Sequence, residues 1–268
     1  MLSPSQANHN PHLKARLAAN ALILGTFIKT PSPSVVEVLG RTGLDCLCLD
    51  AEHAPFDRTS LDVCVLAARS NAIHVLIRVP SSSPEHILTA LDLGATGVLV
   101  PHIRSADEAR AIVRAATYGP GGRGYAGSSR AADYTTLSMA DHQRNSRERT
   151  VIIAQIEDPE AIEQIDSIAQ VEGLDALFIG RADLTVAYGA ESHNSPVVVA
   201  AMQRVCSAAK RHHRPVGLFV AQPSEVPEWQ AQGASFFLVG SDHSLLISGA
   251  AAMLDQLKSP EPCKENRS

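Results

Sequence analysis

The chain has 268 residues, of which 45% are hydrophobic and 19% charged, and its formal net charge at pH 7 is −5. This apolar content excludes a globally disordered chain, and the acidic balance excludes a general nucleic-acid binder, which needs a basic surface. The length suits either two small domains or one α/β barrel, a fold that typically takes about 250 residues.

No stretch reaches the ~18 uninterrupted apolar residues that a membrane span needs. The polar start of the chain lacks the apolar core of a secretion signal. The cysteines form no CxxC pair, so we expect small buried side chains, with neither a disulfide framework nor a zinc site. They are Cys46, Cys48, Cys64, Cys206 and Cys263. These features predict a soluble, cytoplasmic protein without nucleic-acid or membrane partners.

Short apolar runs recur along the whole chain. They are rich in Val, Leu and Ile and nearly continuous, which is typical of strands covered on both faces. The runs are 21–27, 45–50, 73–79, 96–101, 150–157, 174–180, 215–219 and 234–240. Each is therefore expected to form a buried strand.

Amphipathic segments separate these runs and carry helix signals. One of them opens with Ser83-Pro84 and closes at Gly94, which supplies a cap, a proline at the first helical position and a terminal glycine. The segments are 33–43, 83–94, 105–117, 158–170, 195–213 and 241–257. Such alternation predicts βαβ units and a parallel sheet.

Eight strands separated by helices favour a closed (β/α)8 TIM barrel, of the α/β class, over an open sheet. We expect the barrel to span 21–257. A tail and a short leading helix (1–20) precede it, and a disordered tail (258–268) follows it. A Gly-rich stretch at 118–136, followed by a polar helix near 137–149, is too long for a simple connection. Long loops in compact domains are usually functional or disordered.

Charged side chains cluster where the predicted strands end, which is where a barrel carries its active site. Asp50 ends the second strand, Arg78 lies near the end of the third, Glu157 closes the fifth, and Asp183 follows the sixth. Charges at the ends of apolar strands are costly to bury unless they pair or hold a metal.

Glu157 and Asp183 are the candidate metal ligands. Two carboxylates without cysteine or an HxxxH pattern suit a hard cation such as Mg²⁺ or Mn²⁺. In the alternative interpretation each carboxylate caps a helix, since Glu157 precedes Asp158-Pro159 and Asp183 opens a short helical pattern. Their coincidence on adjacent strand ends favours the metal.

His53 and Arg78 are the other candidates. His53 follows Asp50 by three residues, close enough for the carboxylate to orient the imidazole as a general acid or base. Arg78 can bind a carboxylate or stabilise an oxyanion. In the structural alternatives, His53 is a loop histidine and Arg78 pairs with a buried carboxylate.

Lysine is scarce, and only Lys29 lies near a strand end. A Schiff-base enzyme needs a desolvated lysine inside the barrel. Covalent amine catalysis is therefore not expected.

Five motifs carry a family resemblance: DAEHAP (50–55), IRVP around Arg78, LDLGATGVLVP (91–101), QIE (155–157) and the GxADLT run (180–185). They resemble the HpcH/HpaI aldolases, which are metal-dependent class II pyruvate aldolases, and the likeness extends from about residue 22 to 257. It implies reversible cleavage of a 4-hydroxy-2-oxo acid into pyruvate and an aldehyde through a metal-stabilised enolate. The cofactor would be Mg²⁺, Mn²⁺ or Co²⁺, with no nucleotide. The resemblance also implies a last helix exchanged between subunits of a hexamer, a trimer of dimers.

The resemblance assigns roles to individual residues. Glu157 and Asp183 would hold the metal, with Arg78 against the keto or enolate oxygen. His53, oriented by Asp50, would transfer protons. Gln155 and the backbone near Ala182 would line the pyruvate site. Asp92 would reach the site of a neighbouring subunit.

Two departures from the family pattern concern the substrate end. Arg181 stands where members commonly carry proline, and the loop 118–124 is about one residue shorter than usual. Arg181 and Arg123 are therefore expected to select an acidic or aromatic partner.

Other functions remain open on the same scaffold. They are oxaloacetate decarboxylation, a macrophomate-synthase-like bond formation and a citrate-lyase-β-like reaction, although no clear basic cluster for CoA is present. A non-catalytic barrel that binds a metabolite is the least favoured alternative.

Overall fold

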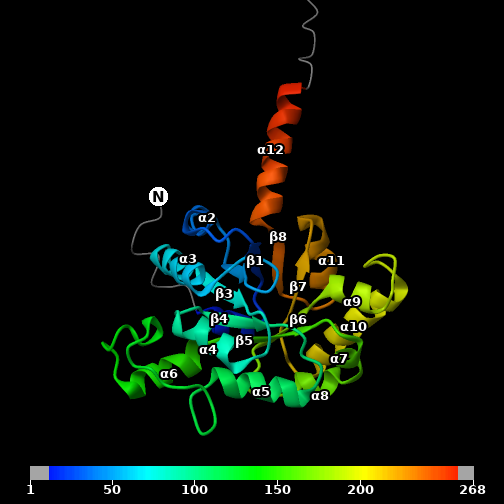
Figure 1. The fold of residues 1–268 in the computed structure, drawn as a ribbon. Coiled ribbons are helices and arrows are strands. Elements are labelled where there is room, and N and C mark those ends of the chain that lie inside the picture. The colour runs from blue at the N-terminus through cyan, green and yellow to red at the C-terminus, as the bar shows by residue number, and fades with distance from the viewer. Residues whose placement is uncertain (1–11, 259–268) are drawn as a thin grey trace, which may run out of the picture.

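Each predicted apolar run forms one strand of a closed parallel barrel of eight strands, in which β8 pairs with β1 (Figure 1). The computed structural model describes residues 12–258. The strands are β1 Ile23–Ile28, β2 Cys46–Asp50, β3 His74–Arg78, β4 Gly97–Val100, β5 Val151–Ile156, β6 Ala176–Ile179, β7 Val216–Val220 and β8 Phe236–Ser241. Helices alternate with them, so the predicted (β/α)8 architecture is confirmed.

The helices begin where the sequence supplies a cap. In α4, the Ser83 hydroxyl accepts a hydrogen bond from the Glu85 N–H, Pro84 takes the first position, and Gly94 follows the helix with a φ of +90°. The linking helices are α2 Pro33–Leu39, α3 Arg58–Ser70, α4 Pro84–Asp92, α5 Ala106–Ala116, α7 Pro159–Glu163, α8 Ile165–Ala169, α10 Pro196–Arg211 and α11 Val226–Ala231. The others are α1 Leu13–Ala18, η2 Arg130–Ala132, α6 Met139–Arg149, α9 Arg181–Ala187, η3 Pro223–Glu225 and α12 Asp242–Lys258.

Two details differ from the expected elements. The segment 158–170 divides into α7 and α8 because Gln164, with φ −104° and ψ 12°, leaves the helical conformation. Helices α3 and α11 form where no helical segment was predicted.

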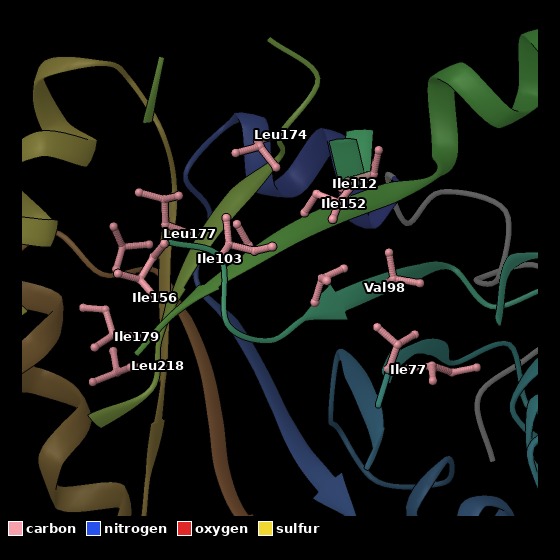
Figure 2. Close-up of a cluster of buried hydrophobic side chains, with 14 of the residues drawn as sticks. Ile77, Val98, Ile103, Ile112, Ile152, Ile156, Leu174, Leu177, Ile179 and Leu218 are labelled. Atoms are coloured by element: carbon pink, nitrogen blue, oxygen red, sulfur yellow. The ribbon is translucent and has the colours of Figure 1, made fainter. Parts of the chain in front are cut away.

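The period of two along each strand separates an inner core from an outer one. On β2, Cys46 and Cys48 belong to the inner cluster, whereas Leu47 and Leu49 belong to the outer one. The outer cluster joins strands to helices, as Figure 2 shows for side chains of β3 to β7 and α5. Leu13 and Leu17 of α1 belong to the inner cluster, so α1 covers the end of the barrel where the strands begin.

The described cysteines are free and buried, as predicted. Burial raises the pKa of the Cys46 thiol to about 12, with the negative charge of Asp45 adding to the effect. Cys263 lies outside the described residues. The thiols inside the barrel are thus inert packing side chains.

Helix α12 projects away from the barrel (Figure 1). All of its residues after Asp242 are exposed, including Leu246 at 67%, Ile247 at 71% and Leu257 at 75%. No helix within residues 12–258 is long and apolar enough to cross a membrane. Within residues 12–258 the helix contacts the barrel at β1 and β8. Its exposed apolar side chains are typical of a surface that contacts another molecule.

Candidate active site

A buried ion pair lies at the end of the barrel where the strands end, which we call the rim. Asp50 and Arg78 are register partners at the ends of β2 and β3. Arg78 Nε donates to Asp50 Oδ1 at 2.9 Å, and Nη2 donates to Oδ2 at 2.8 Å. The guanidinium also stacks over the Phe27 ring, 4.7 Å from its centroid. Fixed on two sides, Arg78 is a preorganised positive charge.

The electrostatics keep this pair ionised. Burial alone would raise the pKa of the Asp50 carboxyl, but the hydrogen bonds and charge of Arg78 outweigh burial and leave the pKa below its ordinary value. In the same way, Asp50 raises the pKa of Arg78 against the effect of burial. The Lys29 ammonium lies 3.5 Å from Asp50 Oδ2, which makes it an ion-pair partner.

His53 contacts Asp50 through its backbone. The His53 N–H donates to Asp50 Oδ1 at 3.1 Å. The imidazole is instead 56% exposed, with Nε2 3.7 Å from Glu52 Oε2. Asp50 thus orients Arg78 and the turn after β2. Among the described residues no Asp50 contact reaches the His53 ring.

Glu157 directly follows β5 and is a buried carboxylate of the rim, with only 2% of the residue exposed. Its Oε1 accepts the His102 N–H at 2.8 Å, and its Oε2 accepts a hydrogen bond from Gln155 Nε2. Burial raises the pKa of Glu157 to about 7 although these hydrogen bonds oppose the rise, and the negative charge of Asp183 adds to it. A positive charge placed next to this carboxylate would favour its ionised form.

Asp183 lies in the first turn of α9, close enough for its charge to raise the pKa of both Glu52 and Glu157. The chain reaches α9 through Gly180, where a Cβ would lie 2.5 Å from the Glu157 Cβ. Only glycine allows so close an approach. The β6–α9 turn thus brings Asp183 within electrostatic range of Glu52 and Glu157, the carboxylates that follow β2 and β5.

Two further residues of the rim, Glu52 and His102, escaped the sequence reasoning. One potential ligand atom from each of Glu52, His102 and Glu157 lies within 4.8 Å of the others. Asp158, Glu157 and Glu52 hold the pKa of His102 above its ordinary value, although burial acts in the opposite direction. The rule that strand ends carry function would have found His102, which directly follows β4 and Pro101.

The residues of the rim fit a divalent cation. Glu52 Oε2 and Gln155 Oε1 are buried without a hydrogen-bond partner among the described residues, although Glu52 Oε2 lies 3.3 Å from Arg78 Nε as an ion-pair partner. Buried polar atoms are normally satisfied, and carboxylates gathered in one place repel each other unless a cation joins them. The donor set of Glu52, Glu157, Asp183 and the His102 imidazole is one that divalent metals accept.

Arg181 is engaged with a neighbouring loop. Its Nη1 donates to Glu225 Oε2 at 2.7 Å, and only 8% of the residue is exposed. Ala182 is exposed at the start of α9. Arg181 therefore ties α9 to η3, and this contact occupies one of its two terminal nitrogens.

Asp92 and Arg123 lie at the opposite end of the barrel. They form an ion pair with each other, and Arg123 stacks over Tyr118, 4.9 Å from its ring centroid. Arg123 lines a cavity shared with Thr96 and Thr150, which directly precede β4 and β5. Within one chain these two residues are not brought to the rim.

Comparison with known proteins agrees with this site. The model of the HpcH/HpaI aldolase/citrate lyase family matches residues 24–249. A 5-keto-4-deoxy-D-glucarate aldolase of Salmonella arizonae is 34% identical over 247 residues, covering 91% of this chain and 96% of that protein. A solved HpcH/HpaI aldolase/citrate lyase family protein of Burkholderia cenocepacia superposes with a TM-score of 0.88 at 30% identity, covering 92% of this chain and 99% of that one.

A macrophomate synthase structure superposes with a TM-score of 0.81 at 26% identity and covers 96% of this chain and 98% of its own. Proteins similar to this chain are therefore named after more than one reaction. The match to the family model and to the aldolases extends over most of the chain. The chain therefore belongs to the HpcH/HpaI aldolase/citrate lyase family and is a carbon–carbon lyase of the class II aldolase type.

Proposed function

We propose that the chain reversibly cleaves a 4-hydroxy-2-oxo acid into pyruvate and an aldehyde, with a divalent cation held by Glu157 and Asp183. The observation that carries this proposal is the buried Glu157 carboxylate, whose pKa is raised to about 7 by burial and by the negative charge of Asp183. A cation would remove that electrostatic cost. When bound, it supplies positive charge for the enolate oxygen that forms on cleavage.

Arg78 supplies the second positive charge. Its Nε and Nη2 are committed to Asp50, and Nη1 has no hydrogen-bond partner within residues 12–258. A donor held in place before reaction stabilises a developing oxyanion without reorganisation. We assign Nη1 to the keto oxygen of the substrate.

Proton transfer at the 4-hydroxyl group falls to His53. Its imidazole is half exposed on the rim, with Glu52 3.7 Å away as a carboxylate partner. A general base removes the hydroxyl proton in cleavage and returns it in synthesis. Gln155, which holds Glu157, and the exposed Ala182 would line the pyruvate site.

We further propose that α12 packs on a second copy of this chain, as expected for a hexamer built as a trimer of dimers. Exposed Leu246 and Ile247 support this, as does the position of Asp92 and Arg123, which could serve only a neighbour's site. Because Ile247 is 71% exposed in the single chain, replacing it with Glu should leave the barrel folded and yield a smaller species in light scattering. A wild-type monomer would contradict the assembly. A cytoplasmic location stays a prediction.

Oxaloacetate decarboxylation and macrophomate-synthase-like bond formation are the second candidate. The similarity to macrophomate synthase favours this alternative, since both reactions pass through a pyruvate enolate. The acidic or aromatic partner that Arg181 and Arg123 were expected to select is less well supported, because Arg181 pairs with Glu225 and Arg123 pairs with Asp92.

Pyruvate release from 4-hydroxy-2-oxo acids of several chain lengths, coupled to lactate dehydrogenase, tests the proposal. EDTA should abolish release, and Mg²⁺, Mn²⁺ or Co²⁺ should restore it. Glu157→Gln is the control variant that should stay inactive with every metal. Pyruvate from oxaloacetate alone would favour the decarboxylase, and full activity of Glu157→Gln would refute the metal assignment.

A further inference from the structure

We propose that the His102 imidazole binds the same divalent cation as Glu157 and gives this site a nitrogen ligand that favours transition metals over Mg²⁺. The inference rests on the proposed function, because it assumes the metal at Glu157. It adds a ligand to the two carboxylates and a preference among metals.

The backbone of His102 is held in an uncommon conformation. Its φ is +56°, in the left-handed region that residues other than glycine rarely adopt. The conformation puts the His102 N–H on Glu157 Oε1, at 2.8 Å. Strain of this kind persists where the surroundings impose it, and it concentrates at functional sites.

The imidazole ring lies among three carboxylates. Its Nδ1 is 3.1 Å from Asp158 Oδ2, in hydrogen-bond contact, and 3.4 Å from Glu157 Oε1, while its Nε2 is 3.8 Å from Glu52 Oε1. If Nδ1–H donates to Asp158, the lone pair of Nε2 is left free toward the acidic cluster. Histidines that bind metals generally donate their other ring N–H to a carboxylate or carbonyl in this way.

The spacing suits ligands of one cation. With bonds of about 2.1 Å, neighbouring ligand atoms are about 3.0 Å apart and opposite ones about 4.2 Å apart. The 3.8 Å between Nε2 and Glu52 Oε1 lies between these limits. The atoms offered by Glu52, His102 and Glu157 lie within 4.8 Å of one another, a bound that exceeds the wider limit by about 0.6 Å. Small side-chain adjustments therefore suffice.

A nitrogen ligand changes which metals are preferred. Sites made only of oxygen suit Mg²⁺, whereas imidazole strengthens the binding of Co²⁺ and its neighbours in the series. Loss of a residue that only orients a metal ligand costs about 10–100-fold in affinity. Loss of His102 as a direct ligand should weaken Co²⁺ binding at least as much, and Mg²⁺ binding by less.

The test uses the full chain loaded with Mn²⁺ and compares His102→Asn with His53→Asn. Asparagine tolerates positive φ, so His102→Asn keeps the backbone and removes the imidazole. His53 is the matched control, because it lies on the same rim outside the Glu52–His102–Glu157 group. Pulsed EPR should detect imidazole nitrogen coupled to Mn²⁺ in the wild type and in His53→Asn, and none in His102→Asn. Calorimetry should give the Co²⁺ and Mg²⁺ affinities.

The outcomes separate this inference from the proposed function. Mn²⁺ that binds in a Glu157-dependent manner without imidazole coupling would refute the role of His102 and leave the aldolase proposal intact. Coupling that persists in His102→Asn would also refute it. A wild type that binds no Mn²⁺ would overturn both.

Discussion

Glu157 destabilises the metal-free protein, so Glu157→Gln should be more stable than the wild type above pH 7 when metal is removed. Burial raises the pKa of Glu157 from the ordinary 4.5 to about 7. Because the folded state holds this proton more tightly, the wild type loses stability as pH rises from about 4.5 to about 7 and is level beyond that range. At about 1.4 kcal/mol for each pKa unit, the full loss is about 3 kcal/mol.

The neutral amide avoids this loss. It can keep both hydrogen bonds, since Oε1 can accept the His102 N–H and the Gln155 side chain, whose Oε1 has no partner within the described residues, can turn to accept from the new amide. A chain of this size shifts its Tm by about 2–4 °C for each kcal/mol, so the variant should melt about 6–12 °C higher at pH 8. Near pH 4 the two proteins should melt together.

Thermal unfolding in EDTA at fixed protein concentration measures this difference. Glu172→Gln, at an exposed carboxylate, is the control and should follow the wild type at every pH. With saturating divalent cation the order should reverse, because the wild type gains binding free energy that the variant lacks. A metal-free Glu157→Gln that melts below the wild type at pH 8 would refute the reasoning.

Three further substitutions test other contacts of the site. Arg78→Ala should cost about 3–5 kcal/mol in urea unfolding because it leaves Asp50 buried and unpaired, and turnover should fall at least about 10²-fold. Gly180→Ala should cost about 1–3 kcal/mol and weaken metal binding measured by calorimetry, since its Cβ would lie 2.5 Å from the Glu157 Cβ. Gly43→Ala, where a Cβ would have nothing within 4 Å, should do neither. Asp242→Asn should cost about 1–3 kcal/mol in the same unfolding assay, because the carboxylate accepts two backbone N–H groups of the β1–α2 loop, at 2.8 and 2.9 Å. Unchanged stability in Asp242→Asn would mean that the loop is held by other contacts.

The strands could be predicted from the sequence because both of their faces are buried. Each strand then appears as a nearly continuous apolar run, with turns and caps at its ends. Helix α3 was missed although Asp57 caps it and its buried positions have helical spacing, because the exposed apolar residues Val63 and Leu66 obscure that pattern. The division between α7 and α8 depends on the backbone of one residue, Gln164, which no periodicity reveals.

The sequence predicted several residues of the rim but not which of them pair with each other. Strand ends identified Asp50, Arg78 and Glu157, but the partner of Asp50 was taken to be the nearby imidazole of His53. In the barrel, the register of β2 and β3 sets Asp50 opposite Arg78, and Arg78 offers two parallel donors that an imidazole cannot match.

Partners distant in sequence were beyond single-sequence reasoning. Arg181 finds Glu225 from the following βα unit, where the capping of η3 fixes the carboxylate. His102 follows a predicted strand and could have been identified by that position, but its left-handed backbone and the hydrogen bond from its N–H to Glu157 could not. Such contacts follow from how the strands close into a barrel.

Deuterium exchange into the methyl group of pyruvate, followed by NMR in D₂O, tests the central claim most directly, because it needs no knowledge of the aldehyde. An aldolase working in the direction of synthesis must remove a methyl proton from pyruvate. We predict exchange that stops in EDTA, returns with Mn²⁺ or Co²⁺, and is absent in Glu157→Gln and Asp183→Asn. Wild-type protein that binds metal and pyruvate yet exchanges no proton would contradict the enolate chemistry proposed for this site.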